Sequence, residues 1–173
     1  MRPSSTTTDK EALILKIKRL NHAVLFVSDI DRSVTFYTDV MGFEVAASEP
    51  RMNAAFLRTP GSMNHHDLGL FGLGAGAAPK QRHQVGLYHL AWQVETIDDL
   101  AAGREALLDA GALTGESSHG ATKSVYGADP DGNEFEIMWL LPRESWGEYE
   151  DKAIVERLDL AGEITRWSGV VTN

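Results

Sequence analysis

The sequence predicts an α+β fold in which two βαβββ modules share one curved mixed sheet, followed by a C-terminal helix. Two observations predict it. First, the stretch "LNHAVLFVSDIDRSVTFYTDVMGFEV", which starts at Leu20, returns in outline as "LYHLAWQVETIDDLAAGREALLDAGA", which starts at Leu87. Second, short strand-like runs separated by turn residues follow each copy. Neither half is expected to bury a core alone, so the two halves should lie side by side.

Composition limits the function classes. The 173 residues are enough for one ordinary domain, with 43% hydrophobic and 24% charged residues. The absence of cysteine excludes disulfides and thiolate metal sites. The net charge of -9 argues against nucleic acid or an anionic membrane as a partner. No apolar run is long enough to span a membrane and the polar N-terminus lacks a secretory signal, so we expect a cytoplasmic protein.

The first module is expected at residues 18–72, after a flexible segment at residues 1–17. Its apolar run "HAVLFV" suits a strand, and Asp29 stands where a helix N-cap is wanted. An amphipathic stretch follows and should stop at Gly42. Three further strands are expected in "FEVAAS", "NAAFLRT" and "HHDLGLFGL", with a Pro-Gly turn before the last.

The second module is expected at residues 85–141, after a Gly- and Ala-rich connector at residues 73–84. Thr96 is its expected helix N-cap, and Gly111 its helix stop. A "TGESS" loop should follow, and then strands in "KSVYGA" and "NEFEIMWLL", separated by a "DPDG" turn.

The C-terminal extension, residues 142–173, lies outside the repeat. Apolar residues recur in it at helical spacing, namely Ile154, Leu158, Ala161, Ile164 and Trp167. This pattern predicts a helix used for packing or dimerisation, so a homodimer or higher homo-oligomer is expected.

Two histidines occupy equivalent positions of the repeat. A single histidine in an apolar strand is more often a hydrogen-bonded core residue, but His22 and His89 match each other across the halves. Around a pseudo-twofold axis both could point into one cavity, where a carboxylate would complete a site for a divalent metal. Glu134 and Glu136 are two apart on one strand and therefore share a face.

The "DPDGN" turn predicts which residues face each other across the last hairpin. If the turn centres on Asp131, Tyr126 and Glu136 are equidistant from it and should be close neighbours on one face. His119 precedes this hairpin in a Gly-flanked loop.

A further histidine begins the last strand of the first module. Counting in twos, His66, Leu68 and Leu70 should share one face of the strand, and His65 and Asp67 the other.

These stretches resemble the vicinal oxygen chelate superfamily, which includes glyoxalases, bleomycin-resistance proteins and extradiol dioxygenases. The resemblance covers roughly residues 18–141 and rests on "LNHAVLFVSDIDRSVTFYTDVMGFEV", "YHLAWQV" and "YGADPDGNEFEIMW" in this order. It implies paired βαβββ modules around a metal cavity, with His22, His89 and Glu136 as metal ligands. The family's turn motif places the ligand carboxylate three residues after the Asn, which selects Glu136 over Glu134.

Within this superfamily, three shorter motifs resemble those of the type I extradiol ring-cleavage dioxygenases, of the catechol 2,3-dioxygenase kind. These are "HHDLGLF", "YHLAW" and "HGATKSVYGADPDGNEFE". The resemblance implies His66 as the acid-base residue, and His119 and Tyr126 as substrate-binding residues. It also implies Fe(II), with Mn(II) as the second metal, and an aromatic diol and O2 as substrates.

Two other readings stay open. A glyoxalase- or epimerase-like isomerase or lyase would use Zn(II), Ni(II) or Co(II) and would generally need a fourth protein ligand from the first module. There the sequence offers His66, while Asp67 is expected on the other face. A metal-free small-molecule-binding protein of the bleomycin-resistance kind would not need His22, His89 and Glu136 together.

Overall fold

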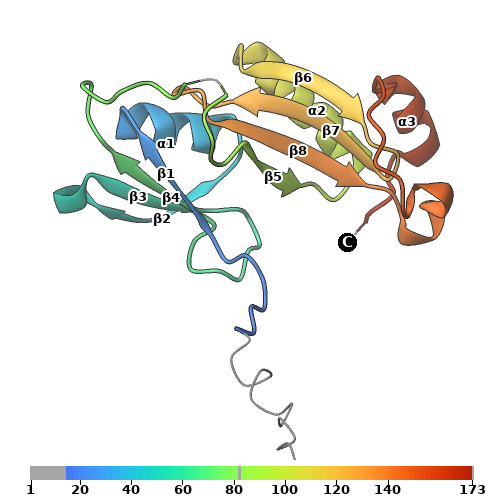
Figure 1. Cartoon of the computed structure of the whole chain (residues 1–173), viewed down its shortest axis with the longest axis horizontal. Coiled ribbons are helices and arrows are strands. Elements are labelled where there is room, and N and C mark those ends of the chain that lie inside the picture. Colours follow the sequence, from blue (N-terminus) through green and yellow to red (C-terminus); the bar gives the residue numbers. More distant parts are fainter. Residues whose placement is uncertain (1–14, 82, 173) are drawn as a thin grey trace, which may run out of the picture.

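The computed structural model describes residues 15–81 and 83–172, which form an α+β fold of two similar modules and a C-terminal segment (Figure 1). The first module contains β1 (Ala23–Val27), α1 (Ile30–Asp39), β2 (Glu44–Glu49), the 3-10 turn η2 (Pro50–Met52), β3 (Ala54–Arg58) and β4 (Leu68–Gly72). The second contains β5 (His89–Gln93), α2 (Ile97–Asp109), β6 (Leu113–Ser118), β7 (Thr122–Ala128) and β8 (Glu134–Leu140). The C-terminal segment holds η3 (Arg143–Ser145), η4 (Gly147–Tyr149) and α3 (Leu160–Trp167).

Each module builds a four-stranded mixed sheet with the same topology. The strand orders are β1-β4-β3-β2 and β5-β8-β7-β6, with the first pair of each order parallel and the others antiparallel. Even the register irregularities match, since one falls in β2 and the other in β6. The repeat and the α+β fold are therefore confirmed. The eight strands pair as two sheets of four, not as one continuous ladder.

The expected helix boundaries are also confirmed. The Asp29 carboxylate accepts a hydrogen bond from the Arg32 backbone N–H at 3.0 Å, and Thr96 caps α2 in a reciprocal capping box. Gly42 and Gly111 follow the two helices with φ of 71° and 64°, in the left-handed region that favours glycine.

In each sheet the side chains alternate between a face buried beneath the helix of its module and the opposite face, which we call the open face. In the first module Leu25, Val27 and Leu70 are buried beneath α1. Val24 and Phe26 alternate with them, and their side chains are 50% and 67% exposed. In the second module the residues between Glu134 and Leu140 alternate in the same way.

The two modules are locked together through α1. The rings of Phe36 and Phe135 lie 6.0 Å apart, and the buried Tyr37 hydroxyl donates to Asp129 at 3.2 Å. Burial, together with the Asp129 carboxylate, raises the pKa of Tyr37 far above its usual value. Residues of both modules belong to one core cluster, so the relative position of the sheets is set by buried contacts.

Two predicted elements differ in the structure. The "TGESS" stretch is the strand β6, because its backbone pairs with β7 although Gly and Ser have low strand propensity. The predicted C-terminal helix is shorter: the chain from Ile154 runs without helix to Asp159, because Glu156 forms a bridge with Ser118 of β6. Among the residues that the structure describes, no helix is long and apolar enough to cross a membrane.

Candidate metal and substrate site

A histidine and a glutamate meet on the open face of the second sheet. His89 begins β5, and its Nε2 lies 3.1 Å from Oε2 of Glu136 on β8. Ser124 of β7 donates to the other carboxylate oxygen at 2.5 Å, so Glu136 is held from both sides. Phe135 and Ile137 are buried on the opposite face, as the alternation predicts. The imidazole and the carboxylate therefore converge in a way that could provide two ligands of a metal.

Tyr126 and His119 lie beside this pair. Tyr126 faces Glu136 directly across the β7–β8 ladder, which confirms the predicted hairpin register. Its hydroxyl lies 2.8 Å from Nε2 of His119, and its ring centroid is 5.9 Å from that of His89. Ser117 approaches the same His119 nitrogen at 2.8 Å. The second module thus assembles a continuous polar cluster from β5, β6, β7, β8 and the loop between β6 and β7.

The first module carries the other histidines. His22 precedes β1, and its ring centroid lies 4.4 Å from that of His66. The His66 ring also packs edge-on to Phe56, at 4.9 Å, and its Nδ1 lies 3.0 Å from Nδ1 of His65. Burial lowers the pKa of His66, and the neighbouring imidazoles of His22 and His65 lower it further. His66 is therefore kept neutral at pH values where a free histidine starts to protonate.

His66 does not share a face with Leu68 and Leu70, so this prediction is wrong. The two leucines are fully buried in the core, whereas the His66 ring contacts Phe56 and His22 toward the open face. The strict alternation fails because β4 begins only at Leu68, after an irregular bend.

Asp67 shapes the bend that presents His66. The buried carboxylate accepts hydrogen bonds from the Thr59 N–H at 2.9 Å, the Ser62 hydroxyl at 2.9 Å and the Asn64 amide at 2.6 Å. Burial by itself would raise the pKa of Asp67, but these hydrogen bonds outweigh it and the pKa is lowered. An ionised, fully bonded Asp67 therefore orders the loop next to His66 and is not free to bind a metal.

The predicted site residues fall into two groups. His89, Glu136, Tyr126 and His119 come together on the second sheet, and His22 and His66 on the first. Within residues 15–81 and 83–172, no three His, Asp or Glu side chains lie close enough to hold a metal ion. The ring nitrogen Nδ1 of His89 is buried without a hydrogen-bond partner among the described residues. The histidines of the first module and the His89–Glu136 pair of the second module therefore lie apart in the structure.

Three partners of the site were missed by the sequence reasoning. Ser124 could have been found, because it lies two residues before Tyr126 on the same strand and so shares its face. Ser117 carries no such signal, because its stretch "TGESS" has the composition of a loop. The third partner is the backbone carbonyl of Ile154, which lies 2.9 Å from Nδ1 of His119. A main-chain contact 35 residues away leaves no mark in the sequence pattern.

The family model described as the glyoxalase/bleomycin resistance protein/dioxygenase superfamily matches residues 19–137. "Biphenyl-2,3-diol 1,2-dioxygenase 3" of Rhodococcus globerulus is 36% identical over 132 residues, which are 73% of this chain and 67% of the relative. "Catechol-2,3-dioxygenase" of Bacillus subtilis (strain 168) is 29% identical over 127 residues, which are 73% of this chain and 43% of the relative.

A solved structure supports the fold. The glyoxylase/bleomycin resistance protein/dioxygenase domain from Frankia sp. EAN1pec superposes with a TM-score of 0.60 at 24% identity. The match covers 72% of this chain and 99% of that chain. At this identity the likeness speaks for the fold alone.

Proposed function

Since this chain belongs to the glyoxalase/bleomycin resistance protein/dioxygenase superfamily, we propose that it is a metal-dependent extradiol dioxygenase that opens a catechol-type ring with O2. The chain spans about two thirds of the length of one curated relative and less than half of the other, and the dioxygenase activities that name these relatives support the proposal. The cytoplasmic location expected from the sequence stays a prediction.

One observation carries the proposal. The His89–Glu136 pair stands next to the Tyr126–His119 pair on the same open face, so possible metal ligands adjoin groups that can hold an oxygen-bearing substrate. A metal-free binding protein would have no need to align an imidazole and a carboxylate at 3.1 Å in this position.

The metal would be held by His22, His89 and Glu136. Two imidazoles and one carboxylate are the donor set that non-haem iron proteins use, so Fe(II) is the metal we propose and Mn(II) the second choice. The donors on the second sheet fit this role, because Ser124 leaves one oxygen of Glu136 directed at His89. When bound, the metal would lower the pKa of a diol hydroxyl and supply the redox chemistry that O2 requires.

The other residues would bind the substrate and move a proton. Tyr126 would form a hydrogen bond with one oxygen of the diol. His119 would orient the Tyr126 hydroxyl through their mutual hydrogen bond. His66, whose pKa is lowered, is neutral and can accept a proton from the substrate before returning it to the product. A positioned acid-base group of this kind contributes roughly 10²- to 10⁴-fold to a rate.

The two halves of the site would be joined by a second copy of the chain. Within one chain, the buried contacts of Tyr37 with Asp129 and of Phe36 with Phe135 hold the sheets in place. His22 could reach Glu136 only if these contacts broke. In a twofold dimer the first sheet of each copy would face the second sheet of the other, which produces two equal sites.

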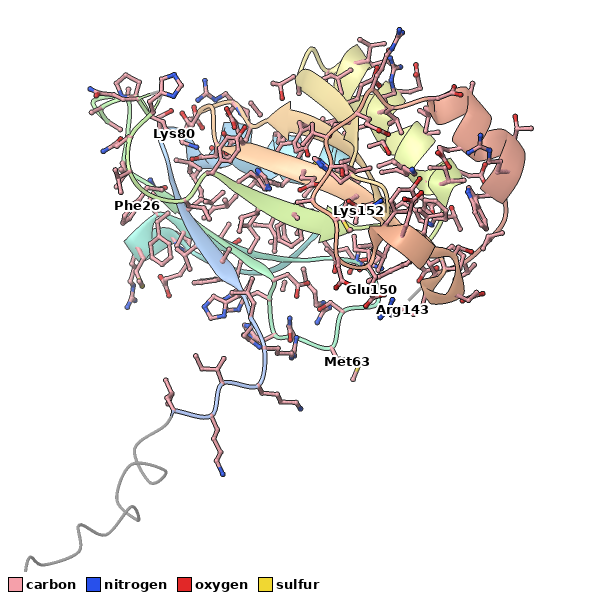
Figure 2. All side chains as sticks on the ribbon, turned by 45° about the vertical axis from the view of Figure 1, so that its right-hand side comes forward. Phe26, Met63, Lys80, Arg143, Glu150 and Lys152 are labelled. Carbon is pink, nitrogen blue, oxygen red and sulfur yellow. The ribbon has the colours of Figure 1, made fainter. Side chains whose placement is uncertain are left out.

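Exposed apolar side chains support this dimer. Val24 and Phe26 follow His22 on the open face of β1, and Leu87 and Tyr88 precede His89, with side chains between 50% and 72% exposed. Figure 2 shows Phe26 on β1, on the side of the molecule away from Arg143 and Glu150. Apolar residues gathered near two half-sites are typical of an interaction surface.

An aerobic assay with a panel of catechols tests the activity. Protein reconstituted with Fe(II) should consume O2 and form a yellow ring-opened product. Glu136→Ala should abolish turnover and weaken metal binding, while the matched control Glu134→Ala, on the same strand face, should keep both. If the protein binds iron yet converts no diol in a broad panel, the proposal fails.

A mixing experiment tests the shared site. His22→Ala and His89→Ala should each be inactive alone. When the two variants are co-expressed and pair at random, about half of the dimers are heterodimers, and each heterodimer has one intact site of its two. Activity should therefore return to about a quarter of the wild-type value. No recovery in a mixture that demonstrably contains heterodimers would show that each site lies within one chain.

A further inference from the structure

We infer that the C-terminal strap, residues 149–158, is a positioning element that fixes His119 as the Nδ1–H tautomer and so makes Tyr126 a hydrogen-bond acceptor toward the substrate. The strap lies outside the family match, which ends at residue 137, so membership of the superfamily does not imply this contact. The inference about Tyr126 rests on the proposed function, whereas the tautomer of His119 does not.

The assignment follows from the partners of the His119 ring. Its Nδ1 lies 2.9 Å from the backbone oxygen of Ile154. A carbonyl oxygen only accepts hydrogen bonds, so Nδ1 must carry the proton. In a neutral imidazole Nε2 is then bare and acts as an acceptor. Both the Tyr126 and the Ser117 hydroxyl lie 2.8 Å from this nitrogen, and either can donate to it.

Two arrangements place both hydroxyl protons within these three contacts. In one, Ser117 donates to the Tyr126 oxygen at 3.3 Å and Tyr126 donates to Nε2 of His119; in the other, Tyr126 donates to the Ser117 oxygen and Ser117 donates to Nε2. Both use the Tyr126 proton within the protein. The Tyr126 hydroxyl therefore has no proton left to donate to the substrate. Toward the open face it presents a lone pair, which suits a protonated hydroxyl of a diol and disfavours an ether or a carbonyl oxygen at that place.

The strap is fastened to the second sheet next to His119. Ser118, which directly precedes His119, exchanges two backbone hydrogen bonds with Glu156, of 2.9 and 2.8 Å. The Tyr149 ring covers Gly120, where an added Cβ would lie 2.5 Å from Cδ1 of the tyrosine. Arg143, Glu150 and Lys152 lie near one another at this end of the molecule (Figure 2), and Arg143 forms an ion pair with Glu150.

Nitrogen-15 spectra of the full chain read the tautomer directly. Two-bond proton–nitrogen correlations from the imidazole rings are recorded with diamagnetic Zn(II) bound, at a pH where His119 is neutral. His119→Gln identifies the resonances. We expect a protonated Nδ1 and a bare Nε2. An Nε2–H tautomer overturns the inference whatever the activity of the protein.

Two backbone substitutions separate positioning from simple stabilisation. An ester in place of the amide of Val155 weakens the Ile154 carbonyl as an acceptor, and an ester at Arg157 weakens the Glu156 carbonyl, which holds Ser118 instead. The Val155 ester should shift His119 toward the other tautomer and raise KM for a diol about 2- to 10-fold, the scale of one hydrogen bond.

The Arg157 ester is the matched control and should leave the tautomer unchanged. Equal effects of both esters on the tautomer would mean that the strap only stabilises the fold, and would overturn the inference. If His119 shows the expected tautomer while no diol is converted, the proposed function fails and the positioning by the strap stands. The wild-type spectrum decides the tautomer even if neither ester variant folds.

Discussion

Lys123 of β7 and Glu163 of α3 form a buried ion pair, and loss of either partner alone should destabilise the fold. The Nζ and Oε1 atoms lie 3.1 Å apart, and the two side chains are only 7% and 11% exposed. Removing one partner of such a pair leaves an uncompensated buried charge, which costs about 3–5 kcal/mol.

The two single variants should differ. Glu163 also lies 3.8 Å from the exposed guanidinium of Arg166, which can compensate its charge after Lys123→Met. After Glu163→Leu, Lys123 keeps only the Ser118 hydroxyl, at 2.9 Å. We therefore expect the free energy of unfolding to fall by about 3 kcal/mol in Lys123→Met and by about 5 kcal/mol in Glu163→Leu. The double variant should return to within about 1 kcal/mol of the wild type, because no buried charge remains.

Urea denaturation measures these free energies of unfolding. For a chain of this length, 3 kcal/mol corresponds to a fall in Tm of roughly 6–12 °C. Arg104→Met is the control: this residue pairs with the partly exposed Glu116 at 2.8 Å and should cost at most about 1 kcal/mol. If the buried single variants cost no more than this control, or if the double variant is as unstable as the worse single one, the reasoning is refuted.

Three further predictions concern the site and its support. Ser124→Ala should weaken metal binding about 10- to 100-fold by calorimetric titration, because Glu136 loses the donor that orients it. Burial lowers the pKa of His66, so the unfolded chain binds more protons than the folded chain. The free energy of unfolding should therefore fall as the pH drops from about 6.5 toward the lower pKa of His66 in the folded protein. In chemical denaturation, His66→Gln should show a shallower fall over this range. Gly127→Ala should cost about 1–3 kcal/mol in the same assay, because its Cβ would lie 2.6 Å from the Phe135 ring.

Much of the local structure could be predicted from the sequence because it depends on near neighbours. The caps at Asp29 and Thr96 need only a short polar side chain before an amphipathic run. The pairing of Tyr126 with Glu136 needs only a tight turn of known centre. His66 was misplaced because strict alternation holds only inside a strand, and the bend around Asp67 comes first.

The repeat, the fold class and the shared face of residues on β7 and β8 follow from periodicity and turn chemistry, which the sequence contains in full. The meeting of particular side chains in the site depends on how the whole chain folds. The tertiary structure placed His22 with His66 and His89 with Glu136 on separate sheets, since the relative position of the modules depends on buried contacts between residues about 90 positions apart. It also placed the Ile154 carbonyl behind His119, since a backbone contact requires no particular side chain at that position.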